Sequence, residues 1–217
     1  MPLLPPTARR LVPDRVRDDV RLRALAVGLG VIPPRAMHSD EEAALLVDLA
    51  RAARTIVEIG VYEGGSAVEI ARHMPRDGEL HLIDPFGKQP GALPRDWAGT
   101  EWATKRTVAR AARGGPRVVW HPTFSHDAAK EWATPIDLLF IDGDHLEPGV
   151  RRDWDDWHGF VVPGGHVAFH DSREGKPHGR GLPGPTAVVD TLFRVGTTPG
   201  WAIAHEVDRT TVVRREP

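Results

Sequence analysis

From residue 54 onward, short apolar segments typical of buried strands alternate with segments of helical character. Such alternation predicts a mainly parallel, doubly wound α/β sheet that is covered by helices on both faces. Two further segments near the C-terminus face each other across a three-residue turn and predict a hairpin, which adds an antiparallel terminal strand to a seven-stranded sheet. The expected strands are 55–59, 79–83, 117–120, 136–141, 165–169, 201–206 and 210–214, and the expected helices of this part are 66–73, 100–113, 127–132, 148–158 and 186–195.

Two more helical patterns, residues 14–29 and 39–53, precede the first strand and are separated by Pro33-Pro34. In the second pattern Ser39 is followed three residues later by Glu42, which is the spacing of a capping box. The proline-rich first dozen residues predict a loose arm. We therefore divide a single structural unit into an N-terminal arm with a helical cap, residues 1–53, and a main domain, residues 54–217.

Composition excludes several functions for this chain of 217 residues. Lys and Arg number 28 against 30 Asp and Glu, so no basic excess exists to bind a nucleic-acid backbone. No apolar run reaches the roughly 18–20 residues of a membrane helix, and the first residues lack the apolar core of an export signal, so we expect a cytoplasmic protein without a membrane partner. The absence of cysteine rules out disulfides, thiolate catalysis and Cys-ligated metals.

Glycines and polar residues follow the first three expected strands, where an open α/β sheet binds its ligands. Gly60 and Gly64 stand in a Gly-x-x-x-Gly turn, which differs from the Gly-x-Gly-x-x-Gly of pyrophosphate sites and disfavours a nicotinamide dehydrogenase. Asp84 ends the second strand, where one carboxylate can accept both hydroxyls of a ribose. Ser125, after the third strand, is a candidate for the rim of an adenine pocket.

These residues resemble motifs I and II of class I S-adenosylmethionine-dependent methyltransferases, and the resemblance covers about residues 54–215. It implies a Rossmann-like fold and S-adenosylmethionine as the methyl donor. By resemblance, Asp84 holds the ribose, Glu58 supports the loop, and the methionine part lies against Gly60, Gly64 and Ser66. The alternative is that Gly60 and Gly64 are ordinary loop glycines and Asp84 forms a turn.

The fourth and fifth strands end in the polar sequences Ile-Asp142-Gly-Asp-His145 and Phe-His170-Asp171. Neighbouring strands lie about 4.8 Å apart, so carboxylates at their ends can share one cation. If the fourth strand lies beside the first, Asp142 also borders the cofactor's methyl group. A divalent cation favours loss of a hydroxyl proton, and a nearby histidine can accept that proton.

The same segment narrows the resemblance, because Asp142 to Asp153 and the later Pro-Gly-Gly and His-Asp are similar to a metal-dependent bacterial O-methyltransferase family. This family includes sugar O-methyltransferases of the macrocin and mycinamicin type and is more distantly similar to catechol O-methyltransferase. The resemblance implies that Asp142 and Asp171 are metal ligands and that His145 is the general base. His170 stands where the relatives usually carry Asp or Glu, and as a ligand it would favour Mn²⁺, Fe²⁺ or Zn²⁺ over Mg²⁺.

Each of these assignments has a simpler alternative. Asp142 could be a turn residue, His145 could cap the following helix, and His170 could contact the substrate instead of a metal. Asp153, Asp155 and Asp156 are expected on a solvated helix face, although Asp153 could brace the site. Trp97 and Trp102 are weak candidates for a substrate platform, and the polar loop from Arg173 to Pro185 is either a lid or an ordinary loop.

The sequence thus predicts an O-methyltransferase that uses S-adenosylmethionine and a divalent metal, Mg²⁺ or Mn²⁺. The acceptor is expected to be a hydroxyl of a small molecule, best a glycosylated natural product or its sugar. The alternatives are a catechol-type phenol O-methyltransferase and a non-catalytic nucleoside-binding module. Leu22, Leu25 and Leu29 form part of an apolar stripe in the cap, which predicts packing on the sheet edge or on a second subunit.

Overall fold

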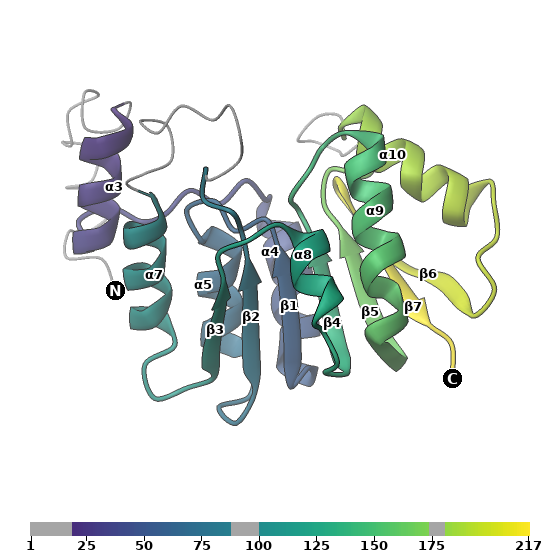
Figure 1. The fold of residues 1–217 in the computed structure, drawn as a ribbon, viewed down its shortest axis with the longest axis horizontal. Helices are drawn as coiled ribbons and strands as arrows, with labels where there is room; N and C mark the ends of the chain where they lie inside the picture. Colours follow the sequence, from purple (N-terminus) through teal and green to yellow (C-terminus); the bar gives the residue numbers. More distant parts are fainter. Residues whose placement is uncertain (1–18, 88–99, 174–180) are drawn as a thin grey trace.

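Seven strands form one sheet in the order β3-β2-β1-β4-β5-β7-β6 in the computed structural model, which describes residues 19–87, 100–173 and 181–217 (Figure 1). β1 to β5 pair in parallel, whereas β7 pairs antiparallel with both β5 and β6. The predicted seven-stranded, mostly parallel α/β sheet with an antiparallel hairpin strand is therefore confirmed. The strands are β1 (Thr55–Ile59), β2 (Glu79–Ile83), β3 (Arg117–His121), β4 (Ile136–Ile141), β5 (Val161–Phe169), β6 (Trp201–Val207) and β7 (Thr210–Arg215).

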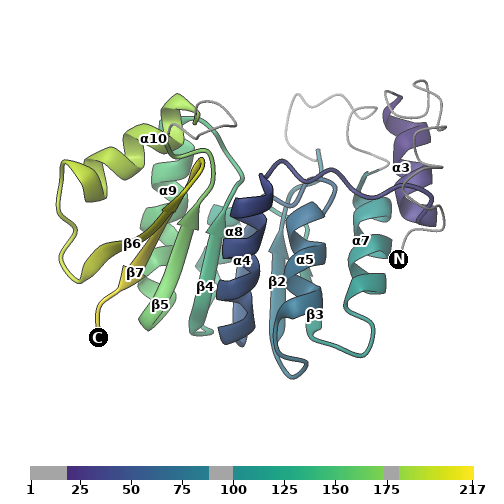
Figure 2. The ribbon, with the colours of Figure 1, turned by 180° about the vertical axis from the view of Figure 1, so that it is seen from behind.

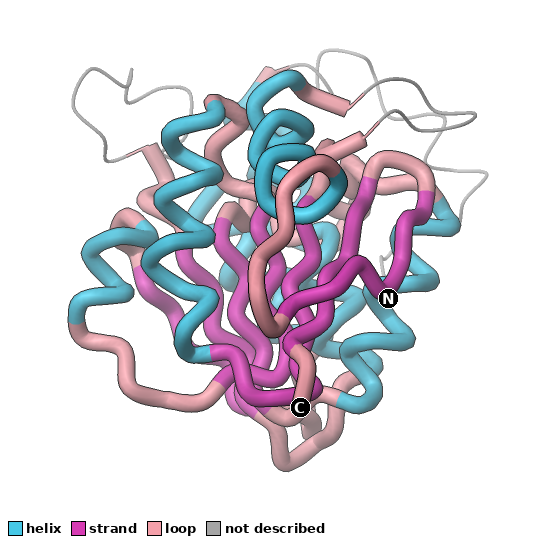
Figure 3. Tube along the Cα trace, turned by 90° about the vertical axis from the view of Figure 1, so that its right-hand side faces the viewer, coloured by secondary structure: helices cyan, strands magenta, loops and turns pink. Residues whose placement is uncertain are grey.

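Helices cover both faces of the sheet (Figures 1 and 2). Figure 2 shows α4 (Asp40–Ala52), α5 (Gly65–His73) and α7 (Thr100–Ala111) on one face, with α3 (Val20–Leu29) at the outer side of α7. The other face carries α8 (Ser125–Lys130), α9 (Glu147–Trp157) and α10 (Pro183–Val189), which a π-helical turn at Asp190–Arg194 extends. Seen along its edge, the sheet is twisted between these two helical layers (Figure 3).

Alternation of side chains along each strand builds a separate core on each face of the sheet. Ile56 and Leu138 point into the core under α4 and α5, together with Leu46 and Ala50 of α4. Their strand neighbours, such as Val57 and Leu139, point into the core under α9 and α10, where Val150, Trp154 and Trp157 are buried. Because parallel strands are covered on both faces, they read as continuous apolar runs in the sequence.

The second N-terminal helix is a full part of the sheet's cover. The predicted capping box is present, because Ser39 Oγ accepts from the Glu42 N–H at 3.2 Å and Glu42 Oε2 accepts from the Ser39 N–H at 2.8 Å. α3 begins at Val20 behind the N-cap Asp19, and the earlier part of the helix expected from residue 14 lies outside the described residues. α3 packs on α7 through Val27 and Ala103.

Several element boundaries differ from those expected. β5 begins at Val161, four residues earlier than predicted, because Val161 pairs with Ile136 of β4 before a bulge at Pro163-Gly164-Gly165 shifts the register. α8 begins at Ser125 instead of residue 127. Within the described ranges, no helix is both long enough and apolar enough to cross a membrane.

Candidate active site

The sheet reverses its strand order between β1 and β4, and a crevice at such a switch point is where open α/β sheets bind ligands. The loops after these two strands touch at Gly60 and Asp142. A Cβ atom on Gly60 would lie 2.2 Å from the Asp142 carbonyl oxygen, and Gly60 has a φ of +86°, so only glycine fits there. The Asp142 N–H also donates to the Ile59 carbonyl at 2.8 Å. The condition that β4 lies beside β1 is therefore met.

The predicted glycine loop leads directly into α5. Gly64 is the N-cap of that helix, and Ser66 in its first turn donates a hydrogen bond to the carboxyl of Glu58. Glu58 is fully buried on β1, and burial raises its pKa well above the usual range. The hydrogen bond between Ser66 and Glu58 therefore fixes the start of α5 to β1. The N-terminus of α5 carries a partial positive charge, which suits a carboxylate such as that of methionine.

Asp84, at the end of β2, connects to the same loop. Its Oδ2 accepts the backbone N–H groups of Val61 at 2.9 Å and Tyr62 at 3.0 Å, and its Oδ1 accepts that of Phe86 at 2.7 Å. The carboxylate is half-buried, and its Oδ1, which accepts one N–H group, keeps lone-pair capacity for a further donor. Asp84 thus organises the glycine loop in addition to the ribose contact predicted for it.

Ser125 and Asp153 form a pair beyond the end of β3. Ser125, the first residue of α8, donates from Oγ to the Asp153 carboxylate of α9. Asp153 is only 4% exposed, and this burial raises its pKa to about 6. The expectation that Asp153 lies on a solvated helix face is wrong, because it shares the inward face of α9 with Val150 and Trp157, whereas Asp155 is exposed.

The acidic and histidine residues after β4 and β5 meet in one cluster. His170 Nδ1 lies 2.9 Å from Asp142 Oδ1, and His145 Nε2 lies 3.8 Å from both Asp142 Oδ1 and Asp171 Oδ2. Asp171 has a φ of +51°, so the chain turns sharply after β5. That turn brings the Asp171 carboxylate to 3.6 Å from His170 Nδ1, although successive strand residues normally point to opposite faces.

The cluster has strong internal electrostatics. Burial by itself would lower the pKa of His170, but the Asp142 carboxylate, with Glu42 and Asp171, raises it to about 10. Burial would raise the pKa of Asp142, yet the contacts with His170 and His145 hold it well below its usual range. The contact with Asp142 also raises the pKa of His145, whose side chain is 43% exposed. A positive charge beside Asp142 is therefore strongly favoured.

Three residues join this cluster that the sequence did not indicate as site residues. His38, just before α4, has its Nε2 3.7 Å from Asp142 Oδ2. Glu42 of α4 lies with Oε1 3.8 Å from His170 Nε2 and accepts from Thr210 at 2.8 Å. Arg209, in the turn between β6 and β7, donates from Nη1 to Asp171 Oδ1 at 2.7 Å. Only Glu42 had a signal in the sequence, as the second member of the capping box.

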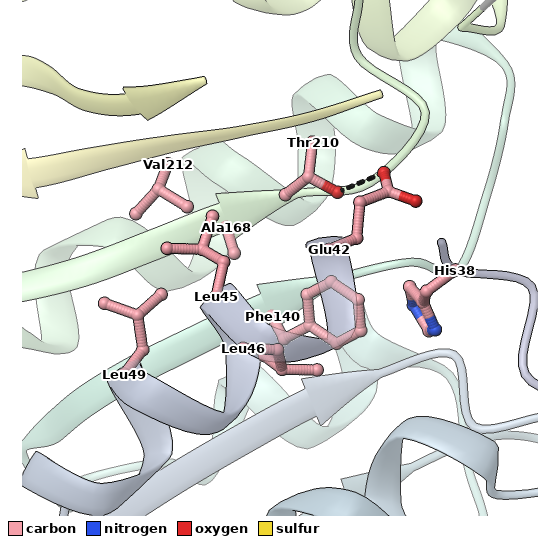
Figure 4. Close-up of a pocket in the computed structure, with 9 residues that line it drawn as sticks. All are labelled: His38, Glu42, Leu45, Leu46, Leu49, Phe140, Ala168, Thr210 and Val212. Carbon is pink, nitrogen blue, oxygen red and sulfur yellow. Dashed lines mark hydrogen bonds between the residues drawn. The ribbon is translucent and has the colours of Figure 1, made fainter. Parts of the chain in front are cut away.

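A small pocket between α4 and the sheet borders this cluster (Figure 4). Figure 4 shows the hydrogen bond from Thr210 to Glu42 and the imidazole of His38 toward one end of the pocket, with Leu49 and Val212 toward the other. The free space is about 10 Å³, which is room for about one water molecule. The lining side chains besides His38, Glu42 and Thr210 are apolar, namely Leu45, Leu46, Leu49, Phe140, Ala168 and Val212.

The group with the spacing of a metal site differs from the predicted set of Asp142, His170 and Asp171. Within the described parts of the chain, one ligand atom each from His38, Asp142 and His170 lie within 4.8 Å of one another. Asp171 stands outside this group, and Arg209 donates to one of its oxygens. The donor set fits a cation, since the buried Nε2 of His38, 3.7 Å from Asp142 Oδ2, has no hydrogen-bond partner in the described residues.

Two weaker expectations concern other parts of the chain. Trp102 is 44% exposed, lies 5.4 Å from the Arg106 guanidinium and packs on Gly28 of α3, so it joins two helices. Trp97 and most of the loop expected as a lid, residues 174–180, lie outside the described residues.

Comparisons with known proteins show the family to which the chain belongs. The family model described as a methyltransferase domain matches residues 57–172. Protein R132 of Acanthamoeba polyphaga mimivirus, which is uncharacterised, is 31% identical over 125 residues, which are 55% of this chain and 52% of that protein. The chain therefore spans about half the length of this curated relative.

Solved structures with the same fold include O-methyltransferases. TomG from Streptomyces achromogenes, which is involved in tomaymycin synthesis and was solved with S-adenosylmethionine, is 22% identical with a TM-score of 0.59, over 97% of this chain and 94% of that one. The O-methyltransferase from Bacillus cereus, solved with S-adenosylhomocysteine, is 18% identical with a TM-score of 0.62, over 96% and 95% of the two chains. By its family match, the chain belongs to the methyltransferase-domain family, and it shares the fold of these S-adenosylmethionine-dependent O-methyltransferases.

Proposed function

We propose that the protein transfers the methyl group of S-adenosylmethionine to a hydroxyl of a small molecule, with the help of a divalent cation. The observation that carries the proposal is the contact between the Gly60 turn and Asp142. It brings the loop of the methyl donor and the acidic-histidine cluster to the same point of the sheet. The O-methyltransferases TomG and that of Bacillus cereus share this fold, which supports oxygen as the acceptor atom.

The loop residues position the donor in this proposal. Gly60 and Gly64 admit the methionine part close to the backbone, and Ser66 and Glu58 keep the loop in place. Asp84 binds the ribose through the lone pair of Oδ1 that the loop amides leave free, and Ser125 borders the adenine. The transfer is a displacement at the methyl carbon, so the protein's main task is to align donor and acceptor and to exclude water.

The cluster prepares the acceptor. A divalent cation, when bound beside Asp142, supplies the positive charge that favours loss of the acceptor's proton. His145 is the base that takes this proton, because its half-exposed side chain can reach an incoming substrate while it contacts Asp142. Arg209 fixes Asp171 at the edge of the cluster through its 2.7 Å hydrogen bond.

A sugar hydroxyl, free or on a glycosylated natural product, is the acceptor that we propose. Alcohols are far less acidic than phenols, whose pKa is about 10, so an alcohol has more need of both a cation and His145. A catechol-type phenol is the second candidate, since the same cluster could orient two neighbouring hydroxyls. A non-catalytic nucleoside-binding module would need none of the clustered groups Asp142, His145 and His170.

Incubation with labelled S-adenosylmethionine, Mg²⁺ or Mn²⁺, and a panel of glycosides and catechols tests the proposal. We expect methylated product from at least one glycoside, and S-adenosylhomocysteine in equal amount. Preference for catechols would replace the sugar acceptor with the second candidate. Binding of the cofactor without product from any panel member would favour the binding module, and absence of cofactor binding would contradict the proposal altogether.

A further inference from the structure

We infer that His38 is a ligand of the divalent cation, so that the site offers two imidazole nitrogens and one carboxylate. The inference rests on the proposed function, because it concerns the cation used there. His38 belongs to neither strand-end motif and comes from the segment before α4. Together with Asp142 and His170 it forms a donor set drawn from three distant parts of the chain.

The distances suit a single ion. His38 Nε2 lies 3.7 Å from Asp142 Oδ2, and His170 Nδ1 lies 2.9 Å from Asp142 Oδ1. The two imidazole rings are 4.5 Å apart between their centres. Ligand atoms that surround a cation at about 2.0–2.2 Å are themselves roughly 3–4 Å apart. Small rotations of these side chains would therefore complete the site.

The environment of His38 also indicates a missing partner. Its side chain is only 6% exposed, and its Nε2 is buried without a hydrogen-bond partner in the described parts of the chain. A buried polar atom without a partner costs free energy, so native proteins rarely keep one unless a ligand or ion satisfies it. The Asp142 carboxylate lies 3.7 Å from this Nε2, and a cation between the two would satisfy the imidazole.

The fold holds His38 in this position. Its neighbour Ser39 is fixed by the capping box of α4, and the ring lies 5.6 Å from that of Phe140 on β4. The preceding residues pass close over the cofactor loop, because a Cβ atom on Gly65 would come within 2.4 Å of the Arg35 carbonyl oxygen. The segment that carries His38 therefore packs against the loop that is proposed to bind the donor.

Glu42 is a positioning residue for the other imidazole. It is buried one helical turn after His38, and its Oε1 faces His170 Nε2 at 3.8 Å. The His170 ring consequently turns its Nδ1 toward Asp142. A carboxylate behind a ligating histidine is a common arrangement in metal sites, where it fixes the ring orientation.

This donor set indicates the class of cation. Mg²⁺ and Ca²⁺ prefer oxygen ligands, whereas imidazole suits Zn²⁺, Fe²⁺, Co²⁺ and related ions. A site with two imidazoles and one carboxylate should therefore bind these transition metals, and Mn²⁺, in preference to Mg²⁺.

Titration of the metal-free protein with Co²⁺ tests the inference without any turnover. We expect the wild type to develop the visible absorption of nitrogen-ligated Co²⁺ and to retain it in excess Mg²⁺. His38→Ala should lower the Co²⁺ affinity at least about tenfold and change the absorption spectrum. His205→Ala is the matched control, because His205 lies exposed on β6, and it should behave as the wild type.

Equal Co²⁺ affinity and equal spectra of His38→Ala and the wild type would overturn the inference. Thermal unfolding of each variant checks that the fold is intact, and His38→Gln, which is closer in size, replaces the alanine variant if that one unfolds. Calorimetry with S-adenosylhomocysteine separates the two proposals. A wild type that binds Co²⁺ through His38 but no nucleoside contradicts the proposed function, whereas active enzyme with unchanged Co²⁺ binding in His38→Ala contradicts this inference alone.

Discussion

The His170 imidazole donates from Nδ1 to Asp142 Oδ1 across 2.9 Å, and this hydrogen bond joins the ends of β4 and β5. The pair sits beside the switch point, so Asp142 borders the Gly60 turn with its backbone carbonyl and the histidines with its carboxylate. With its pKa raised to about 10, His170 carries a positive charge at neutral pH. In this structure the positive charge of His170 neutralises the negative charge of Asp142. In the proposed enzyme a bound cation would do the same.

Removal of divalent metal should abolish methyl transfer and leave the affinity for S-adenosylhomocysteine nearly unchanged. The reason is that the proposed nucleoside contacts come from the glycine loop and Asp84, which are not members of the group of His38, Asp142 and His170. Turnover measured with EDTA, and calorimetry on the same sample, check this expectation. Full activity in EDTA with a true acceptor would contradict the metal-assisted reaction and leave His145 as an unaided base.

His145→Ala should lower the methyl-transfer rate by roughly 10²–10⁴-fold, the usual contribution of a general base. Its side chain is half-exposed and is not part of the group of His38, Asp142 and His170. Co²⁺ binding should therefore persist in this variant, which distinguishes it from His38→Ala. The rate and the Co²⁺ affinity are measured on the same preparation, and parallel loss of both would mean that His145 acts as a ligand.

Asp84→Ala should weaken binding of S-adenosylhomocysteine by about 1.5–3 kcal/mol, the range for hydrogen bonds to a charged group. Because Asp84 also accepts from the Val61 and Tyr62 amides, part of the loss would come from a looser glycine loop. Asp84→Asn keeps one acceptor oxygen and should lose less. Calorimetry gives both affinities, and unchanged binding by the alanine variant would exclude Asp84 as the ribose contact.

Much of the fold could be predicted from local patterns, because these patterns indicate which residues are buried and where helices and strands begin and end. The apolar runs of the strands, the Ser39–Glu42 capping box and the polar residues after each strand are all local features, and they placed Asp142 and His170 together. Asp153 was misjudged although its spacing from Val150 and Trp157 puts it on the inward face of α9. A charged side chain favours a solvated position, whereas the helical periodicity, which is the better guide here, favours burial.

The rest of the site depends on tertiary arrangement that no local pattern encodes. His38 reaches Asp142 only because α4 packs on the sheet, and its flanking sequence has no metal-site spacing. Arg209 reaches Asp171 only because β7 inserts beside β5 instead of at the outer edge. Asp171 and Arg209 are 38 positions apart in the sequence, and His38 and Asp142 are farther apart still.

The N-terminal cap is predicted to pack on the sheet edge or on a second subunit; α4 packs on a face of the sheet, and self-association through α3 stays a prediction. On α3, Leu22, Leu25 and Leu29 are 45%, 51% and 49% exposed. If a second copy covers them, light scattering after gel filtration should give a dimer or larger species, and Leu25→Glu should shift it to the monomer. Arg21→Glu, a nearby polar position on the same helix, is the control. A monomeric wild type at high concentration would contradict the expectation.

Asp153 should make the stability of the protein fall as the pH rises. Its pKa increases from an ordinary value of 3.8 to about 6 in the folded chain, because burial on α9 disfavours the charged carboxylate. Between these two values the folded chain binds more protons than the unfolded one, so the free energy of unfolding decreases with rising pH. The full cost, about 2–3 kcal/mol, applies above pH 6. Asp153→Asn keeps an acceptor for Ser125 without the charge and should therefore gain stability relative to the wild type between pH 4 and pH 7.5.

Urea unfolding of the wild type and Asp153→Asn at these two pH values checks the sign as well as the size. The control is Asp155→Asn, because Asp155 lies two residues away with its side chain 50% exposed and paired with Arg151. That variant should show no gain, since a solvated carboxylate is charged at little cost. If the difference in unfolding free energy between Asp153→Asn and the wild type were the same at both pH values, Asp153 would titrate normally. Its position beside Ser125 would then have to be solvated enough to hold a full charge at neutral pH.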